Sequence, residues 1–376
     1  MTALLPAAPA STPLLASWPA PECWLDTDET ELVCRAVLDV THNVKSFCLA
    51  SPDGSVFAFE PGQFVTLELE IDGQSISRCY TISSPPTRPH LLSITVKRVT
   101  GGPVSNWLHD TMAPGARLRV RAPLGGFTLR APVAARYLFL SAGSGITPLM
   151  SMTRTLADLG SDADVLFVHS ARTPADIVFR RELDAITAVH PNIRVAYVCE
   201  ADHETERWQG LRGRLSAAVL MAMAPDVHER VTYTCGPAPY MASVRTILTE
   251  LGYDLASYHE ESFTFETVVA ALGADADAPG TDADDDSGIV THSVELVRSG
   301  VTLRCGATQT ILDAAYAAGV RVPASCTQGM CGTCKSSKLS GEVDMQHNGG
   351  IRPREIAQGK ILLCCSTPLG DVRIDA

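Results

Sequence analysis

Four cysteines have a spacing that suits one-electron chemistry: Cys326, Cys331, Cys334 and Cys364. The first three follow the pattern C-x4-C-x2-C and the fourth comes from a distant segment, which is a ligand spacing typical of a [2Fe–2S] cluster. Gly329 and Gly332 lie within the loop, and their lack of a Cβ atom lets the backbone approach two irons closely. Because such a cluster accepts one electron at a time, the sequence predicts a redox relay.

The cysteine pattern also admits other interpretations. A zinc site usually has two Cys-x2-Cys pairs, and only one is present here. Structural disulfides are disfavoured because the sequence shows no secretory signal. Cys365 competes for the fourth ligand position, and we choose Cys364 because its offset from Cys334 resembles that of plant-type ferredoxins. We expect residues 361–365 to form a strand.

The residues before this loop predict a small domain with a hairpin and a helix. Thr310 and Asp313 form a capping box that opens a helix continuing through residues 314–318. Gly319 follows at the position where a left-handed residue ends a helix. Residues 294–297 and 301–304 are expected to form a hairpin that turns at Ser299-Gly300.

A glycine turn further upstream suits a nucleotide. An apolar strand over residues 137–140 precedes the pattern G-x-G-x-x-P, and a helical pattern follows it. Such a turn offers bare N–H groups and a helix dipole to a pyrophosphate, although an ordinary βα turn would look the same. The residues that carry the pattern are Gly143, Gly145, Thr147 and Pro148.

Further strands follow with helical segments between them. Residues 164–169, 194–199 and 230–235 are apolar and rich in β-branched side chains, which predicts a parallel α/β sheet with ligands at the carboxyl ends of its strands. The last strand ends in Cys235, Gly236 and Pro237. A small buried hydrophobic residue is the alternative interpretation of Cys235.

Short strands with Gly/Pro turns come before the nucleotide segment. Residues 64–69 and 92–97 are examples, and they predict an antiparallel β-barrel. Arg78 suits a phosphate, and Tyr80 offers a flat face to a ring. A second glycine turn, at Gly102 and Ser105, suits a pyrophosphate. Each feature alone is compatible with an ordinary strand or turn.

Length and charge bound the organisation of the chain. At 376 residues it is too long for one typical domain, and its net charge of −12 disfavours nucleic-acid binding. We predict a disordered arm over residues 1–31, a barrel over 32–130 and a nucleotide domain over 131–266. An acidic, flexible linker over 267–289 and a cluster domain over 290–376 complete the chain. No segment predicts a membrane span, and the scattered remaining cysteines indicate a cytoplasmic setting.

Together these motifs resemble the ferredoxin–NADP reductase superfamily. Its flavin motif R-x-Y-[ST] matches Arg78, Tyr80 and Thr81, and its pyrophosphate turn matches Gly102, Val104 and Ser105. Its nicotinamide motif matches Gly143, Gly145, Thr147 and Pro148, and its C-G-P motif matches Cys235, Gly236 and Pro237. The resemblance covers residues 32–376 and implies an FAD-binding barrel, an NAD-binding α/β domain and a β-grasp ferredoxin domain.

The resemblance also implies a path for electrons and a set of site residues. NADH gives a hydride to the flavin, and the cluster passes single electrons to a partner protein. Thr81, Cys235 and Glu261 are the implied catalytic residues. Val96, Lys97 and Phe263 complete the implied cofactor-binding set. FAD is preferred over FMN because a ring motif and a separate pyrophosphate turn both occur. NADH is preferred over NADPH by resemblance, and Arg172 would suit a 2′-phosphate.

The domain order resembles the reductase components of Rieske-type oxygenases. Residues 258–263 and 345–350 resemble most the glycine betaine demethylase reductases. This implies an oxygenase partner that acts on glycine betaine or a related quaternary amine, without nucleic acid or membrane. A reductase for a hybrid-cluster protein or a desaturase is a second possibility. A non-catalytic redox relay or sensor subunit is a third, which the intact cofactor motifs disfavour.

Overall fold

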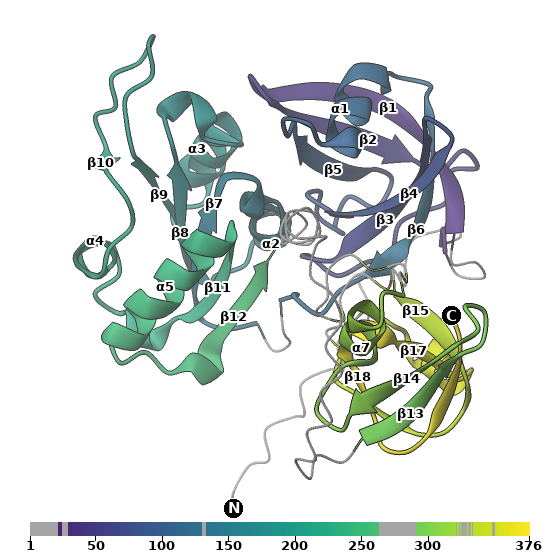
Figure 1. Ribbon diagram of the computed structural model, residues 1–376. Helices are drawn as coiled ribbons and strands as arrows, with labels where there is room; N and C mark the ends of the chain where they lie inside the picture. Colours follow the sequence, from purple (N-terminus) through teal and green to yellow (C-terminus); the bar gives the residue numbers. More distant parts are fainter. Residues whose placement is uncertain are drawn as a thin grey trace, which may run out of the picture.

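The computed structural model describes residues 22–24, 29–129, 133–262, 291–320, 322, 324, 329, 332, 334–347 and 350–376. They form three folded units in chain order, coloured from purple through teal to yellow (Figure 1). Most of the predicted N-terminal arm and the whole predicted linker over residues 267–289 lie outside these ranges. No helix among the described residues is long and apolar enough to cross a membrane.

The first unit is a six-stranded antiparallel barrel, as the sequence predicts. Its strands are ordered β4-β3-β6-β1-β2-β5, and an antiparallel bridge between Ile82 and Ile94 joins the two ends. Alternate residues of each strand enter the core. The bounds are β1 (Glu29–Thr41), β2 (Val44–Ala50), β3 (Phe64–Ile71), β4 (Gln74–Thr81), β5 (Leu92–Lys97), α1 (Pro103–Thr111) and β6 (Arg117–Leu124).

The prediction of a disordered arm that reaches residue 31 is wrong at its end. Strand β1 begins at Glu29, where Glu29 and Glu31 form ion pairs with arginines of β6. Cys23 and Trp24 are buried in the barrel core, and the Cys23 N–H donates to the Val56 carbonyl oxygen at 2.8 Å. The proline-rich composition of the preceding residues masked this short apolar anchor.

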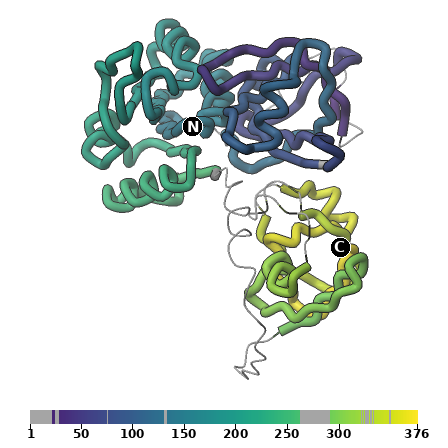
Figure 2. Tube along the Cα trace, turned by 45° about the horizontal axis from the view of Figure 1, so that its top comes forward, coloured from purple at the N-terminus to yellow at the C-terminus, as the bar shows by residue number. Residues whose placement is uncertain are grey.

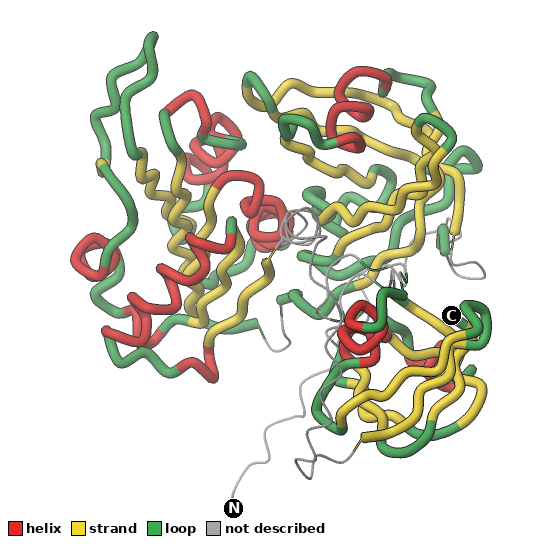
Figure 3. The backbone as a smooth tube through the Cα atoms, in the orientation of Figure 1, coloured by secondary structure: helices red, strands yellow, loops and turns green. Residues whose placement is uncertain are grey.

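The second unit is a parallel sheet with helices on both faces (Figure 3). Its strand order is β10-β9-β8-β7-β11-β12, and every neighbouring pair is parallel. Side chains of α2 and α3 pack on one face, and side chains of α4 and α5 pack on the other. The strands are β7 (Arg136–Ala142), β8 (Asp164–Ala171), β9 (Ile193–Cys199), β10 (Leu211–Arg212), β11 (Val231–Gly236) and β12 (Tyr258–Ser262). The helices are α2 (Ile146–Asp158), α3 (Arg180–Val189), α4 (Ala217–Met223) and α5 (Ala238–Glu250).

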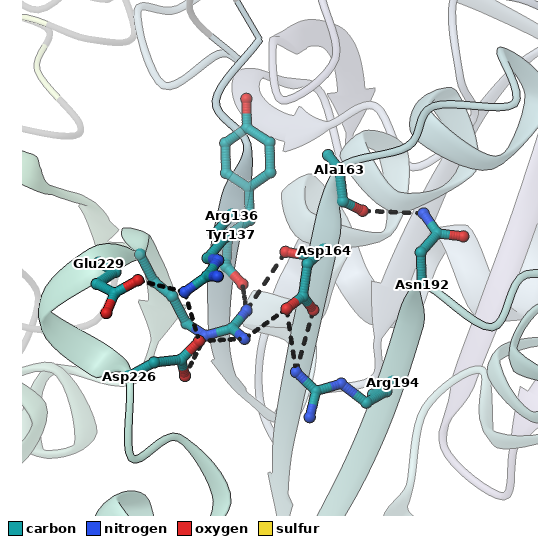
Figure 4. Close-up of polar contacts among 9 residues, drawn as sticks. Arg136, Tyr137, Ala163, Asp164, Asn192, Arg194, Asp226 and Glu229 are labelled. Atoms are coloured by element: carbon teal, nitrogen blue, oxygen red, sulfur yellow. Dashed lines mark hydrogen bonds and ion pairs between the residues drawn. The ribbon is translucent and has the colours of Figure 1, made fainter.

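A buried arginine ties together the amino ends of these strands. Arg230 is 2% exposed, and its guanidinium donates to both carboxylate oxygens of Asp226 at 2.9 Å and to Asp164 Oδ2 at 2.8 Å. It also donates to the Tyr137 carbonyl oxygen at 3.0 Å. Figure 4 shows Asp164 and Asp226 approached by further arginines, among them Arg194. The network lies at the amino ends of the strands, whereas the glycine turn follows the carboxyl end of β7.

The third unit is a mixed five-stranded sheet, ordered β14-β13-β19-β15-β17, with a separate two-stranded pair of β16 and β18. In Figure 2 it forms a body of its own at the C-terminal end of the chain. The predicted hairpin is present. Its elements are β13 (Thr291–Leu296), β14 (Val301–Gly306), α7 (Ile311–Ala317), β15 (Lys335–Ser340), β16 (Val343–Met345), α8 (Pro353–Ala357), β17 (Lys360–Leu362), β18 (Ser366–Pro368) and β19 (Val372–Asp375).

Local signals for helix α7 act as predicted, whereas the strand predicted at Cys364 stops early. The Thr310 hydroxyl accepts from the Asp313 N–H at 3.2 Å, and Gly319 has φ +73°. Strand β17 ends at Leu362, and residues 363–365 form a 3₁₀ turn instead of continuing the strand. The turn is the reason why Cys364 is buried while its neighbour Cys365 is partly exposed.

Candidate functional site

The parallel sheet has a topological switch point between β7 and β11. The chain runs outward from β7 through β8 and β9, then returns to place β11 on the other side of β7. Ligands of open α/β sheets bind where the order reverses, at the carboxyl ends of the strands. The 3₁₀ turn Gly143–Gly145 follows β7 at this point, and Pro237 follows β11 as the N-cap of α5.

The two nucleotide motifs meet at the switch point. A Cβ atom at Gly145 would lie 2.3 Å from the Cys235 carbonyl oxygen and 2.5 Å from the Gly236 nitrogen. Gly143 has φ +54° and lines a cavity, so its bare backbone can face a ligand. Thr147 and Pro148 are buried in the first turn of α2, where the Thr147 hydroxyl donates to the Ser144 carbonyl oxygen at 3.1 Å.

A cavity of about 310 Å³ opens from this junction. It is lined by both folded units, because Lys97 at the end of β5 faces residues of the second unit across it. Its lining carries side chains of both charges. These charged side chains are Lys97, Arg172, Asp176, Glu200 and Arg214. The shape and the mixed charge suit the adenosine and phosphate parts of a dinucleotide.

Cys235 and Glu261 are partners on the neighbouring strands β11 and β12, and both are buried. Burial raises the pKa of Glu261 to about 8, so its carboxyl group is mostly protonated at neutral pH. Burial, with a smaller effect of Glu261, raises the pKa of Cys235 well above its usual range. The pair therefore presents a neutral thiol and a neutral carboxyl group, both of which can donate hydrogen bonds. Phe263 lies outside the described residues.

A second polar pair lies on the next two strands, in register with Cys235 and Glu261. This pair was not predicted from the sequence. Ser141 is the β7 partner of Cys235, and its hydroxyl lies 2.7 Å from Nδ1 of His169 on β8. Burial lowers the pKa of His169 to about 3, so the imidazole is neutral. A lone His and a lone Ser inside apolar strands carry no local signal, because only the register of the sheet brings them together.

The flavin motif lies on β4 of the barrel. Arg78 donates to the Ser77 carbonyl oxygen at 2.8 Å, and Tyr80 packs partly buried against the core. Thr81 is buried, and its hydroxyl oxygen has no hydrogen-bond partner among the described residues. A buried hydroxyl without a partner is costly unless a ligand satisfies it, so this position fits a bound ring with polar edge atoms.

The second flavin turn is closed by its own side chains. Ser105 Oγ accepts from the Val99 N–H at 3.1 Å and donates to the Gly102 carbonyl oxygen at 3.3 Å. Gly102 is the N-cap of α1, and Val104 is buried in its first turn, so the helix presents free N–H groups suited to a pyrophosphate. The Val96 side chain points into the barrel core, which leaves only its backbone for a cofactor.

The described part of the cluster site contains Cys334 and Cys364, whereas Cys326 and Cys331 lie outside the described residues. The Gly329 N–H donates to Cys364 Sγ at 3.2 Å. A Cβ atom at Gly332 would lie 2.8 Å from the Gly350 carbonyl oxygen. Two buried thiols, a backbone N–H directed at sulfur and a loop that only glycine fits are the features that an iron–sulfur cluster needs.

Comparison with protein families gives one match for each folded unit. Residues 32–129 match the oxidoreductase FAD-binding domain, and residues 139–246 match the oxidoreductase NAD-binding domain. Residues 294–369 match the 2Fe-2S iron-sulfur cluster binding domain. The chain belongs to the ferredoxin–NADP reductase superfamily. It is an NAD(P)H-dependent oxidoreductase, and these matches confirm the predicted FAD, NAD and [2Fe–2S] domains.

Relatives share the full arrangement of this oxidoreductase. The glycine betaine monooxygenase reductase subunit of Pseudomonas aeruginosa is 45% identical over 91% of this chain and 94% of its own length. The stachydrine N-demethylase reductase subunit Stc4 of Rhizobium meliloti is 42% identical over 94% of this chain and 98% of its own. A solved structure of phthalate dioxygenase reductase has the same fold, with a TM-score of 0.56 at 24% identity over 93% of this chain and 98% of that chain.

Proposed function

We propose that this oxidoreductase takes electrons from NADH and delivers them singly to a Rieske-type monooxygenase that demethylates glycine betaine or a related quaternary amine. The observation that carries this proposal is the sequence similarity to reductase subunits named for glycine betaine and stachydrine. Their identity to this chain is 42% to 46%, and the match extends over at least 91% of it. Stachydrine and glycine betaine are both quaternary ammonium carboxylates, so the proposal extends to that substrate class. The substrate would bind the oxygenase and not this chain.

The residues of the site have distinct tasks in this proposal. Bound FAD supplies the conversion of a hydride into two single electrons, and the cluster supplies the one-electron exit. Gly143, Gly145 and Pro237 hold the dinucleotide at the switch point. Thr81 would donate a hydrogen bond to the flavin edge, and the buried pair of Cys235 and Glu261 would supply neutral hydrogen-bond donors beside the nicotinamide.

The charges of the cavity support NADH as the electron donor. The Asp176 carboxylate is 14% exposed and accepts from the Thr173 hydroxyl at 2.8 Å. Burial opposes its ionisation, but this bond and the charge of Arg172 hold its pKa below the usual range. Arg172, which would suit a 2′-phosphate, is thus paired 3.4 Å from an anion. An ionised carboxylate accepts a ribose hydroxyl and repels a phosphate.

Coenzyme preference tests this part of the proposal. Asp176→Ala should raise the ratio of kcat/KM for NADPH over that for NADH by about tenfold or more, because one buried charge is removed. Asp162→Asn, on the exposed surface before β8, is the matched control and should leave the ratio unchanged. An unchanged ratio in Asp176→Ala would show that Asp176 has no role in the choice between NADH and NADPH.

The oxygenase assay tests the function as a whole. The purified protein with FAD and its cluster, NADH, the cognate oxygenase and glycine betaine should yield formaldehyde, with one NADH consumed for each demethylation. A null result with glycine betaine, stachydrine and carnitine, together with rapid reduction of a hybrid-cluster protein, would overturn the oxygenase assignment. Failure to reduce cytochrome c with NADH while all cofactors are bound would overturn the reductase itself.

A further inference from the structure

Arg154, in the middle of α2, joins the nucleotide unit to the barrel. Its side chain is 11% exposed, and its guanidinium binds Glu182 of α3 through two parallel bonds of 2.7 and 2.6 Å. The remaining Nη1 donates to the carbonyl oxygen of Ser83 at 2.5 Å. A bidentate pair fixes the plane of the guanidinium, so the direction of the third bond is fixed as well.

The carbonyl that Arg154 holds belongs to the flavin segment. Ser83 lies two residues beyond Thr81, and its N–H donates to the Ser93 carbonyl oxygen at 2.8 Å. Its hydroxyl lies 2.8 Å from the Thr95 hydroxyl. These bonds join Ser83 rigidly to the barrel strand β5, so a force on its carbonyl reaches the end of β4.

The other end of the same helix carries the nucleotide turn. Helix α2 begins at Ile146, directly after the turn Gly143–Gly145. Ser151 adds a second bond from this helix to the barrel, since its hydroxyl donates to the Ser84 carbonyl oxygen at 2.7 Å. Asp158, at the last turn, accepts from Arg88 Nη2 at 2.6 Å. One helix therefore contacts both the segment proposed to hold the flavin ring and the turn proposed to hold the nicotinamide nucleotide.

Backbone strain lies beneath the guanidinium. Phe179 is a non-glycine residue with φ +58°, and its ring centroid lies 4.7 Å from the guanidinium carbon of Arg154. A bulky residue in the left-handed region is strained and persists only where its surroundings hold it. The guanidinium of Arg154 is therefore packed between the Phe179 ring, the Glu182 carboxylate and the Ser83 carbonyl of the barrel, which fix its position.

We propose that Arg154 is a positioning residue that sets the separation between the flavin and the nicotinamide. The proposal rests on the proposed function, because it takes Thr81 and Gly143–Gly145 as the contacts of the two rings. Hydride transfer needs reacting atoms about 3–3.5 Å apart, and a displacement of about 1 Å can lower the rate by about 100-fold. Arg154 does not line the dinucleotide cavity, and it acts by fixing the two units relative to each other.

Arg154→Gln and Arg154→Lys in the full chain with its cofactors test the proposal. Each should lower the limiting rate of flavin bleaching by NADH, measured by stopped flow, by about 10- to 100-fold. The FAD content and the affinity for NAD⁺, measured by titration calorimetry, should stay within about twofold, since Arg154 does not line the dinucleotide cavity and its guanidinium is bound to Glu182 and Ser83. Arg194→Gln, which removes an exposed arginine–carboxylate pair of the same unit, should bleach at the wild-type rate.

A role in interface stability alone would give a different pattern. An unchanged limiting rate in folded Arg154→Gln would overturn the proposal, and so would a loss of NAD⁺ affinity at constant rate. If the Arg154 variants do not fold, Glu182→Gln weakens the Arg154–Glu182 pair from the more exposed side and should lower the limiting rate by a smaller factor. An unchanged limiting rate in Glu182→Gln would also overturn the proposal. Failure of the wild-type protein to bleach would instead contradict the proposed function.

Discussion

Gly145 packs so closely against Cys235 that a Cβ atom on the glycine would lie 2.3 Å from the carbonyl oxygen of the cysteine. The backbone of Gly145 is in the ordinary right-handed region, with φ −64°, so its conformation does not require glycine. The requirement comes from the contact between the ends of β7 and β11. The two sequence motifs are thus two sides of one packed junction.

The junction predicts a strong effect of Gly145→Ala. The new methyl group must push β11 away from the turn, and flavin reduction by NADH should fall by about 100-fold because the dinucleotide is displaced. Gly160→Ala is the matched control, since Gly160 has φ +58° and nothing within 4 Å of the added atom. It should lower stability by about 1 kcal/mol and leave the rate unchanged. Stopped-flow bleaching and thermal unfolding separate the two effects.

Arg230→Met should destabilise the nucleotide unit. The change removes the buried partner of Asp226 and Asp164 and leaves the Tyr137 carbonyl oxygen without this donor, which costs about 1–3 kcal/mol because both carboxylates are partly exposed and keep Arg136 and Arg194 as partners. Denaturant unfolding followed by circular dichroism measures the loss. Arg194→Gln at the exposed side of the same network should cost no more than about 1 kcal/mol. A loss below 1 kcal/mol in Arg230→Met would contradict a stabilising role for the network.

Glu261 predicts a dependence of stability on pH. The unfolded glutamate titrates near pH 4.5 and the folded one near 8, so the folded state binds more protons between these values. The free energy of unfolding of the wild type, relative to Glu261→Gln, should therefore fall as pH rises from about 4.5 to 8 and then level off. Melting temperatures at pH 5 to 9 measure this difference. Glu250→Gln, at the exposed end of α5, is the control.

Cys364 and Cys365 allow a direct test of the fourth cluster ligand. Cys364→Ser should abolish the visible absorbance and the iron content expected for a [2Fe–2S] centre, because this thiol receives the Gly329 N–H. Cys365→Ser should retain both, since the Cys365 thiol is directed at the Leu362 carbonyl oxygen. FAD content, which depends on the barrel, should be the same in both variants. Cluster loss in Cys365→Ser alone would reverse the assignment.

Features with a short-range cause could be predicted from the sequence. The capping box at Thr310, the left-handed Gly319 and the strand before Gly143 all depend on residues within a few positions. The order of the three folded units could also be predicted, because each has its own motif. The barrel, the parallel sheet and the ferredoxin-like sheet are present as predicted.

Features that depend on register or distant packing could not be predicted. The 3₁₀ turn at Cys364 interrupts an apolar run that looks like a continuous strand. Strand β12 was not predicted, although it places Glu261 beside Cys235. Arg154 lies on a helix whose sequence gives no sign that its partner is a carbonyl oxygen 71 residues earlier. In each case the determining contact comes from a segment far away in the chain.

The parallel sheet also separates two kinds of residue along its strands. The dinucleotide cavity lies at the carboxyl ends of the strands. Arg230 and its carboxylates, Asp164 and Asp226, lie at the amino ends (Figure 4). Buried ionic groups can often be exchanged as a set for apolar side chains without loss of stability. The amino ends of the strands are therefore the place where a protein engineer can raise thermal stability without changing coenzyme choice or turnover.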